Sequence, residues 1–149
     1  EKMAAQITAA GLTDEPEKLW ENTEIGSVVC SVRPGDGSAR EQAASCQRVL
    51  GGLANICIEY ATKRYRSNLI NWGMIPFTCD PELIERIENG DNIFITHVRE
   101  AVLSCKSSVD AWLLREGQKP EKIQLFLKNL TKEEADIIAA GCLINYYSV

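Results

Sequence analysis

The sequence predicts an α/β domain in which helices flank a mixed, layered β-sheet. Helix-type and strand-type segments alternate along most of the chain, and several strand-type segments gather in its second half. The chain has 149 residues, of which 45% are hydrophobic, and this is enough for one domain with its own core.

The first half of the chain predicts two strand–helix pairs. An opening helix stops at Gly11, and the uncharged run IGSVVCSV (25–32) predicts a buried strand. After a glycine-rich turn, residues 39–52 contain helix formers and end in a Gly-Gly pair, which is typical of a helix terminus. Residues 53–60 then predict a strand, and residues 61–73 a short helix that ends at Gly73.

The second half predicts further strands between two helices. A short strand at residues 74–79 precedes a helix at 80–91, where Asp80 suits the N-cap and Pro81 the first helical position. The later segments predict strands, the first of them containing His97, at residues 92–98, 100–107 and 122–130.

The chain closes with one predicted helix over residues 131–147. Thr131 and Glu134 form a T-x-x-E capping box at its start.

Charge and composition exclude several classes of protein. A net charge of −5 argues against a nucleic-acid-binding protein, which needs Lys and Arg to neutralise phosphates. No apolar run is long enough to span a membrane, and no signal peptide is visible, so we expect a cytoplasmic protein without membrane partners. The six cysteines are widely spaced without a C-x-x-C pair, which predicts reduced thiols and no metal site built by this chain alone.

The stretch VRPGDGSAREQAASCQ (32–47) supports two interpretations. Ser38 and Glu41 form an S-x-x-E capping box, so Ser38 is a candidate helix cap. The same position is a candidate anion site, because a helix N-terminus favours negative charge and the fork of Arg40 suits a carboxylate. Gly37 would let the backbone approach such a ligand closely. A phosphate-binding loop is excluded, because G-x-x-x-x-G-K-[ST] is missing.

Other polar residues are candidates for either packing or function. Three basic residues on one predicted helix form a solvated face or place charge near an anionic substrate: Lys63, Arg64 and Arg66. Asp36 is a turn residue or an extra carboxylate. His97 is expected to be structural or on the surface.

These motifs resemble the C-terminal swivel domain of the aconitase superfamily. GDGSAREQAA is similar to the family signature G-x-G-S-S-R-E-H-A. The family continues with F-x-x-I-x-x-x-N-x-x-x-x-G-x-L-P, which Asn68, Gly73 and Pro76 match. The later run IENGDNIFI and the closing helix are also similar to family elements, so the resemblance covers residues 25–147.

The resemblance implies a fold, a division of the chain and a reaction. The fold is a swivelling β/β/α domain over residues 1–149, with a helix and linker at 1–24 and the swivel core and closing helix at 25–149. The reaction is a hydro-lyase interconversion of citrate and isocitrate, or of a similar hydroxy-acid. A [4Fe-4S] cluster in other domains or in a large subunit would bind the substrate, and this chain alone would be an incomplete part of a larger enzyme.

The resemblance also implies roles for individual residues. Ser38 would be the catalytic base, Arg40 would bind the substrate, and Ala39 would contribute a backbone N–H, with Gly37 beside them. Ala39 replaces a serine of the signature, Gln42 replaces its histidine, and the family's second arginine has no clear match here.

Two alternatives remain open at this point. One is the small subunit of an isopropylmalate- or homoaconitate-type isomerase, since such subunits are separate chains of about this size. The other is an inactive homologue that keeps the fold as a binding module, to which Ala39 and Gln42 lend support.

Overall fold

The computed structural model describes residues 2–148 and contains one mixed sheet. Its six strands are β1 (Ser27–Ser31), β2 (Gly52–Cys57), β3 (Ile75–Thr78), β4 (Asn92–Ile95), β5 (Ser108–Leu114) and β6 (Glu121–Phe126). They lie in the order β1-β2-β3-β6-β5-β4, with β1, β2 and β3 parallel and the other pairs antiparallel. Within residues 2–148, strand pairing between the parallel and the antiparallel half consists of Thr78 opposite Phe126.

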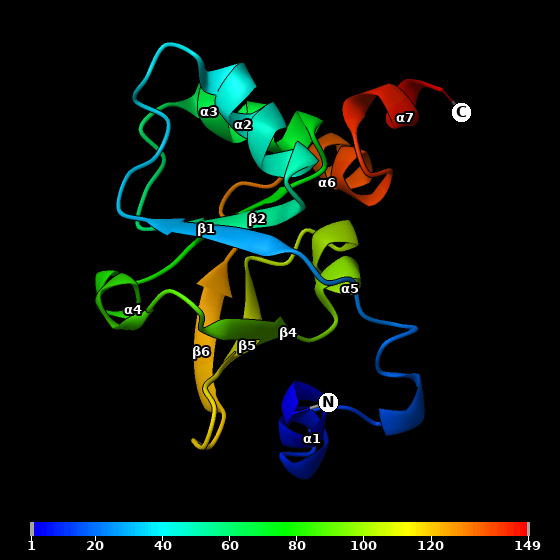
Figure 1. Cartoon of the computed structure of the whole chain (residues 1–149). Helices are drawn as coiled ribbons and strands as arrows, with labels where there is room; N and C mark the ends of the chain where they lie inside the picture. Colours follow the sequence, from blue (N-terminus) through cyan, green and yellow to red (C-terminus); the bar gives the residue numbers. More distant parts are fainter. Residues whose placement is uncertain (1, 149) are drawn as a thin grey trace.

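Helices connect the strands and cover the sheet. They are α1 (Lys2–Ala9), the 3-10 turn η1 (Pro16–Lys18), α2 (Arg40–Val49), α3 (Lys63–Asn71), α4 (Pro81–Arg86), α5 (Val98–Leu103), α6 (Lys132–Ala139) and α7 (Leu143–Tyr147). In Figure 1, α2 and α3 lie above the parallel half, and the antiparallel half lies on its other side. The layered α/β fold that the sequence predicts is therefore confirmed.

The main core fills the space between the two halves of the sheet. It takes apolar side chains from both halves, including Ile56, Phe77, Ala111, Leu113 and Leu125. A second cluster, with Ala44, Tyr65, Leu69 and Met74, fixes α2 and α3 on the outer face of the parallel half. Burial of such side chains stabilises the fold by about 1.5–3 kcal/mol for each large residue, so α2 and α3 are firmly placed.

The first strand is not buried, contrary to the prediction. β1 is an edge strand that pairs only with β2, and Val28 and Val29 are 37% and 36% exposed. Its uncharged sequence resembles that of an interior strand, but its place in the sheet depends on the pairing order, which the strand itself does not encode.

Residues 100–107 were predicted as a strand, and this prediction is wrong. Residues 98–103 form α5, because Val98, Ala101, Val102 and Cys105 repeat with helical spacing and pack on the main core. His97 is consequently not inside a strand but at the N-cap of α5, exposed and with φ 51°. The strand β5, which follows, was not predicted at all.

The closing helix is two helices rather than one. Gly141 has φ 89° and separates α6 from α7. A Cβ on Gly73 would lie 1.9 Å from the carbonyl oxygen of Gly141, so the two backbones touch at this break. The capping box of Thr131 and Glu134 at the start of α6 is present as predicted.

Candidate functional site

Two loops leave the same edge of the sheet, because β1 and β2 are parallel neighbours. The loop after β1 runs over residues 32–39, and the loop after β2 runs over residues 58–62. The carbonyl of Val32 accepts from the N–H groups of Ile58 (3.2 Å) and Glu59 (3.3 Å), and that of Pro34 accepts from Ala61 (2.9 Å). The carboxyl end of parallel strands is where α/β sheets usually bind ligands.

Gly35 ties the glycine turn to the starts of both helices. Its carbonyl oxygen accepts hydrogen bonds from Nε of Arg40 (3.2 Å) and from Oγ1 of Thr62 (3.3 Å). Thr62 also caps α3, by accepting from the N–H of Tyr65 at 3.2 Å. Only glycine fits at position 35, because φ is 94° and a Cβ would lie 2.4 Å from Cβ of Tyr65.

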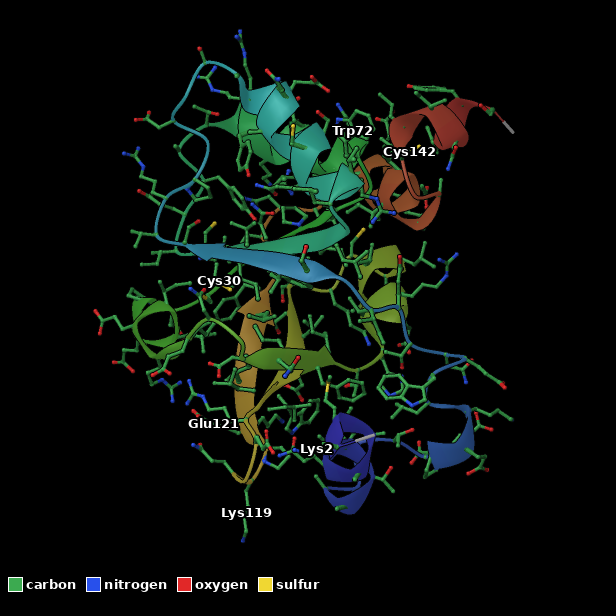
Figure 2. All side chains as sticks on the ribbon, in the orientation of Figure 1. Lys2, Cys30, Trp72, Lys119, Glu121 and Cys142 are labelled. Carbon is green, nitrogen blue, oxygen red and sulfur yellow. The ribbon has the colours of Figure 1, made fainter. Side chains whose placement is uncertain are left out.

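Ser38 does not cap α2, so the predicted capping box of Ser38 and Glu41 is wrong. The N-cap is Ala39, and no side chain caps the helix. Glu41 instead accepts a hydrogen bond from Nε1 of Trp72 at 3.0 Å, at the end of α3 (Figure 2). Trp72 is the C-cap of α3, and its hydrogen bond holds the carboxylate of Glu41 away from the backbone that a capping box would use.

Ser38 lies in an open hollow of about 350 Å³ between the starts of α2 and α3. Every side chain of its lining is polar or charged: Ser38, Arg40, Glu41, Lys63, Arg64, Ser67 and Asn68. The volume is at the lower end of the range of small-molecule sites, about 300–1,000 Å³. With three basic side chains and one acidic side chain, the hollow favours a small anion.

The structure brings together only some of the residues predicted for the site. Ser38, Arg40 and Asn68 line the hollow, whereas Gly37 and Ala39 are exposed on either side of Ser38 without lining it. Asp36 is exposed in the turn and is also outside the lining.

Arg66 is on the same helix as Lys63 and Arg64 but has a structural role. Its guanidinium pairs with both carboxylate oxygens of Glu134, at 2.8 and 3.3 Å. Burial raises the pKa of Glu134. Hydrogen bonds from Arg66 and from the backbone of Thr131 lower this pKa by more than burial raises it, so the net pKa lies below the ordinary value. Arg66 therefore joins α3 to α6 and does not serve the hollow.

A buried polar cluster joins the two helices whose starts form the hollow. The hydroxyl of Tyr65 accepts hydrogen bonds from Nε2 of Gln47 (2.8 Å) and from Nδ2 of Asn55 (2.9 Å). Tyr65 is 2% exposed and Asn55 is fully buried, so these bonds join α2, β2 and α3 in a dry environment.

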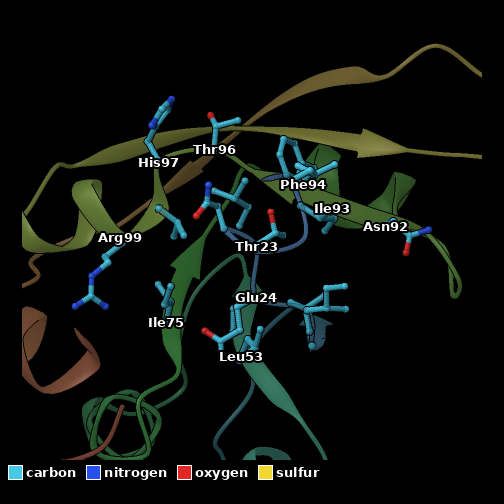
Figure 3. Close-up of a pocket in the computed structure, with 18 of the residues that line it drawn as sticks. Thr23, Glu24, Leu53, Ile75, Asn92, Ile93, Phe94, Thr96, His97 and Arg99 are labelled. Atoms are coloured by element: carbon cyan, nitrogen blue, oxygen red, sulfur yellow. The ribbon is translucent and has the colours of Figure 1, made fainter. Parts of the chain in front are cut away.

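A larger hollow, of about 940 Å³, lies between the N-terminal arm and the sheet (Figure 3). Its lining mixes apolar side chains such as Ile93 and Phe94 with Thr23, His97 and Arg99. Residues 37–40 take no part in it. Because the candidate base and its anion-binding partners are elsewhere, we place the functional site in the smaller hollow.

The cysteines do not contribute a metal centre within the described range. All six are free thiols, and burial raises the pKa of Cys57 and Cys79 to about 11, which makes both thiols unreactive. Among residues 2–148, no group of three or more His, Cys, Asp or Glu side chains is arranged to hold a metal ion. Over the same range, no helix is both long and apolar enough to cross a bilayer.

Comparison with known proteins agrees with this geometry. Residues 12–82 match the model of the aconitase C-terminal domain. This segment, just under half of the chain, is similar to the aconitase C-terminal domain. It includes β1, β2 and β3 with the whole lining of the hollow, so the aconitase-type sequence and the candidate site coincide.

A likeness in fold to a solved structure extends over nearly the whole chain. The crystal structure of 3-isopropylmalate dehydratase (leuD) from Methanocaldococcus jannaschii superposes with a TM-score of 0.55. The alignment covers 96% of this chain and 77% of that protein at 24% sequence identity, a level at which the likeness concerns the fold. No curated protein sequence matches the chain.

The sequence analysis did not predict that the starts of α2 and α3 together line one hollow. Ser67 was not singled out, and Lys63 and Arg64 were not separated from Arg66. The signal was present in the order of elements, because two successive strand–helix units of a parallel sheet place their loops side by side.

Proposed function

We propose that this aconitase-type domain supplies the proton-transferring side of a hydro-lyase active site. The substrate would be a small hydroxy-acid with at least two carboxylates. The observation that carries the proposal is the place of Ser38, which is released from helix capping and lies in a basic hollow beside Arg40.

Arg40 is placed to hold a substrate carboxylate. Its Nε donates to the carbonyl of Gly35, which fixes the guanidinium and leaves the two Nη groups to bind the carboxylate. The N-terminal end of α2 adds a positive electrostatic potential next to Ser38.

Ser38, as its alkoxide, would remove a proton from the carbon next to that carboxylate. The electron pair of the broken C–H bond forms the carbon–carbon double bond as the hydroxyl group leaves and takes up a proton as water. Negative charge that develops on the carboxylate is stabilised by Arg40. Rehydration reverses these steps with the hydroxyl group on the neighbouring carbon.

The family resemblance implies a [4Fe-4S] cluster, which when bound would supply Lewis-acid chemistry for loss of the hydroxyl group. No ligand set for a cluster is found among residues 2–148, so the cluster does not fit this chain. We assign it to a partner, either the remaining domains of a longer protein or a large subunit.

Two substrate classes are compatible with the site as described. Citrate and isocitrate are one, and isopropylmalate- or homoaconitate-type acids are the other, since the superposed structure is named 3-isopropylmalate dehydratase. In either case this chain contributes Ser38 and Arg40, with Gly37 and Ala39 presenting the backbone beside them.

The test is a hydratase assay on the complete protein with its cluster reconstituted without oxygen. Formation and loss of the unsaturated acid are followed by absorbance in wild type, in Ser38→Ala and in the control Ser45→Ala. Ser45 lies on α2, the helix that follows Ser38, and outside the hollow, with its hydroxyl donating to the carbonyl of Gln42. We expect Ser38→Ala to lower kcat roughly a hundredfold to ten-thousandfold with little change in KM. Equal activity of wild type and Ser38→Ala would remove Ser38 as the base, and inactivity of wild type on every acid would indicate a binding module.

A further inference from the structure

Lys63 and Arg64 begin α3 and line the same hollow as Ser38 and Arg40. Their position follows from the topology. Ser38 follows β1 and Lys63 follows β2, and these two strands are adjacent and parallel, so both loops end at one side of the sheet. The bonds from Thr62 and Arg40 to the carbonyl of Gly35 hold the two helix starts together.

The two charges are not neutralised by this chain. Within residues 2–148, no carboxylate lies at ion-pair distance from Lys63 or Arg64, whereas Arg66 on the same helix is paired with Glu134. The acid in the hollow, Glu41, is hydrogen-bonded to Trp72. The hollow therefore keeps an excess of positive charge, which a bound anion would neutralise.

The proposed reaction already assigns Arg40 to the carboxylate beside the reacting carbon. Lys63 and Arg64 bring two further cations into the hollow, together with the polar side chains of Ser67 and Asn68. The lining offers no apolar side chain to an alkyl substituent. Burying an alkyl group against charged side chains gains little, while a carboxylate there gains charge-assisted hydrogen bonds.

We infer that Lys63 and Arg64 form a second anion-binding subsite, which receives a carboxylate at the position where isopropylmalate-type acids carry an alkyl group. Lys63 and Arg64 are then specificity-determining residues for the proposed reaction. This inference rests on the proposed function for the identity of the reaction, but not for the existence of the subsite.

Binding of two unreactive acids tests the subsite without catalysis. Tricarballylate and glutarate share a carbon chain and differ by one carboxylate, and neither has a hydroxyl group to lose. Calorimetry on the complete protein should show tricarballylate binding at least about tenfold more tightly than glutarate at low salt. The preference should shrink as salt is added, because the charges are exposed.

The double variant Lys63→Gln/Arg64→Gln should lose this preference, while the charge-conserving variant Lys63→Arg/Arg64→Lys keeps most of it. Both side chains are exposed and outside the cores, so the fold should be retained. The matched control is Lys119→Gln, which removes a charge at the tip of the β5–β6 hairpin, far from α3 (Figure 2). This variant should behave like wild type.

The outcomes separate the two proposals. Equal binding of both acids by wild type, or a preference that survives in the double variant, would overturn the subsite, even where turnover still depends on Ser38. A preference that disappears in the double variant supports the subsite, even where no hydro-lyase activity is found. With activity present, the double variant should lose at least about tenfold in kcat/KM on a tricarboxylate, mainly through KM, and much less on isopropylmalate.

Discussion

The hydroxyl of Thr62 donates a hydrogen bond to the carbonyl oxygen of Gly35, 27 positions earlier in the sequence and 3.3 Å away. This bond joins the glycine turn after β1 to the start of α3, and the same oxygen accepts from Arg40. The carbonyl of Gly35 therefore helps to fix the relative placement of Ser38, Arg40 and Lys63. The candidate site is built across two strand–helix units, and contacts between these units should control it.

Replacement of Thr62 by valine should loosen this junction. Valine has nearly the same shape but neither caps α3 nor donates to Gly35, so the variant should lose about 1–2 kcal/mol of unfolding free energy. It should also raise KM more than it lowers kcat, because the anion-binding groups lose their fixed spacing. Thr62→Ser keeps the hydroxyl and is the control for urea unfolding and kinetics. A Thr62→Val variant with the stability and KM of Thr62→Ser would contradict the role of the bond.

The two glycines of the turn should respond very differently to alanine. At Gly35 the backbone has φ 94° and a new Cβ would meet the side chain of Tyr65, whereas at Gly37 no atom lies within 4 Å of a new Cβ. Gly35→Ala should therefore cost about 2–4 kcal/mol, and Gly37→Ala should change stability by less than about 1 kcal/mol. Thermal unfolding of the two variants gives the comparison. Similar losses of stability in both would show that the side chain of Tyr65 can move aside.

Much of this arrangement follows from local sequence signals. The glycine stops, the capping box of Thr131 and Glu134 and the alternation of residues 122–130 all predicted elements that the structure contains. These signals act within a few residues, which is why a single sequence is enough to detect them.

The remaining features depend on contacts between distant segments. Glu41 accepts from Trp72, 31 positions away, so the S-x-x-E pattern around Ser38 was a misleading local signal. The exposure of β1 depends on its place at the sheet edge, and the meeting of Lys63 with Ser38 depends on β1 and β2 being neighbours. Such facts become available only with the pairing order of the strands.

The hydroxyl of Tyr65 should stabilise the support beneath the site. In Tyr65→Phe the amides of Gln47 and Asn55 lose their partner, and Asn55 has no access to water. The expected loss is about 1–3 kcal/mol, from leaving a buried polar group without a hydrogen bond. Tyr147→Phe is the control, because Tyr147 is 70% exposed and its loss should be close to zero. Urea unfolding with unchanged m-values measures both.

The pairing of Glu134 with Arg66 should make part of the stability depend on acid pH. The folded-state pKa of Glu134 lies below its ordinary value of 4.5, so folding favours the ionised form. Its contribution is complete at pH values above the unfolded-state pKa and disappears as the pH falls through the lower, folded-state pKa.

Comparison of wild type with Glu134→Gln should therefore show a gap that closes with acid. Glutamine keeps the capping geometry of α6 but removes the charge, and at neutral pH we expect a loss of about 1–3 kcal/mol. Urea unfolding at steps between about pH 7 and about pH 3 should show this difference shrinking below about pH 4.5. The control is Glu133→Gln, the exposed neighbour, whose effect should stay within about 0.5 kcal/mol at every pH. A gap for Glu134→Gln that persists unchanged to the lowest pH would mean that packing of α6, rather than the charge of Glu134, holds α3 in place.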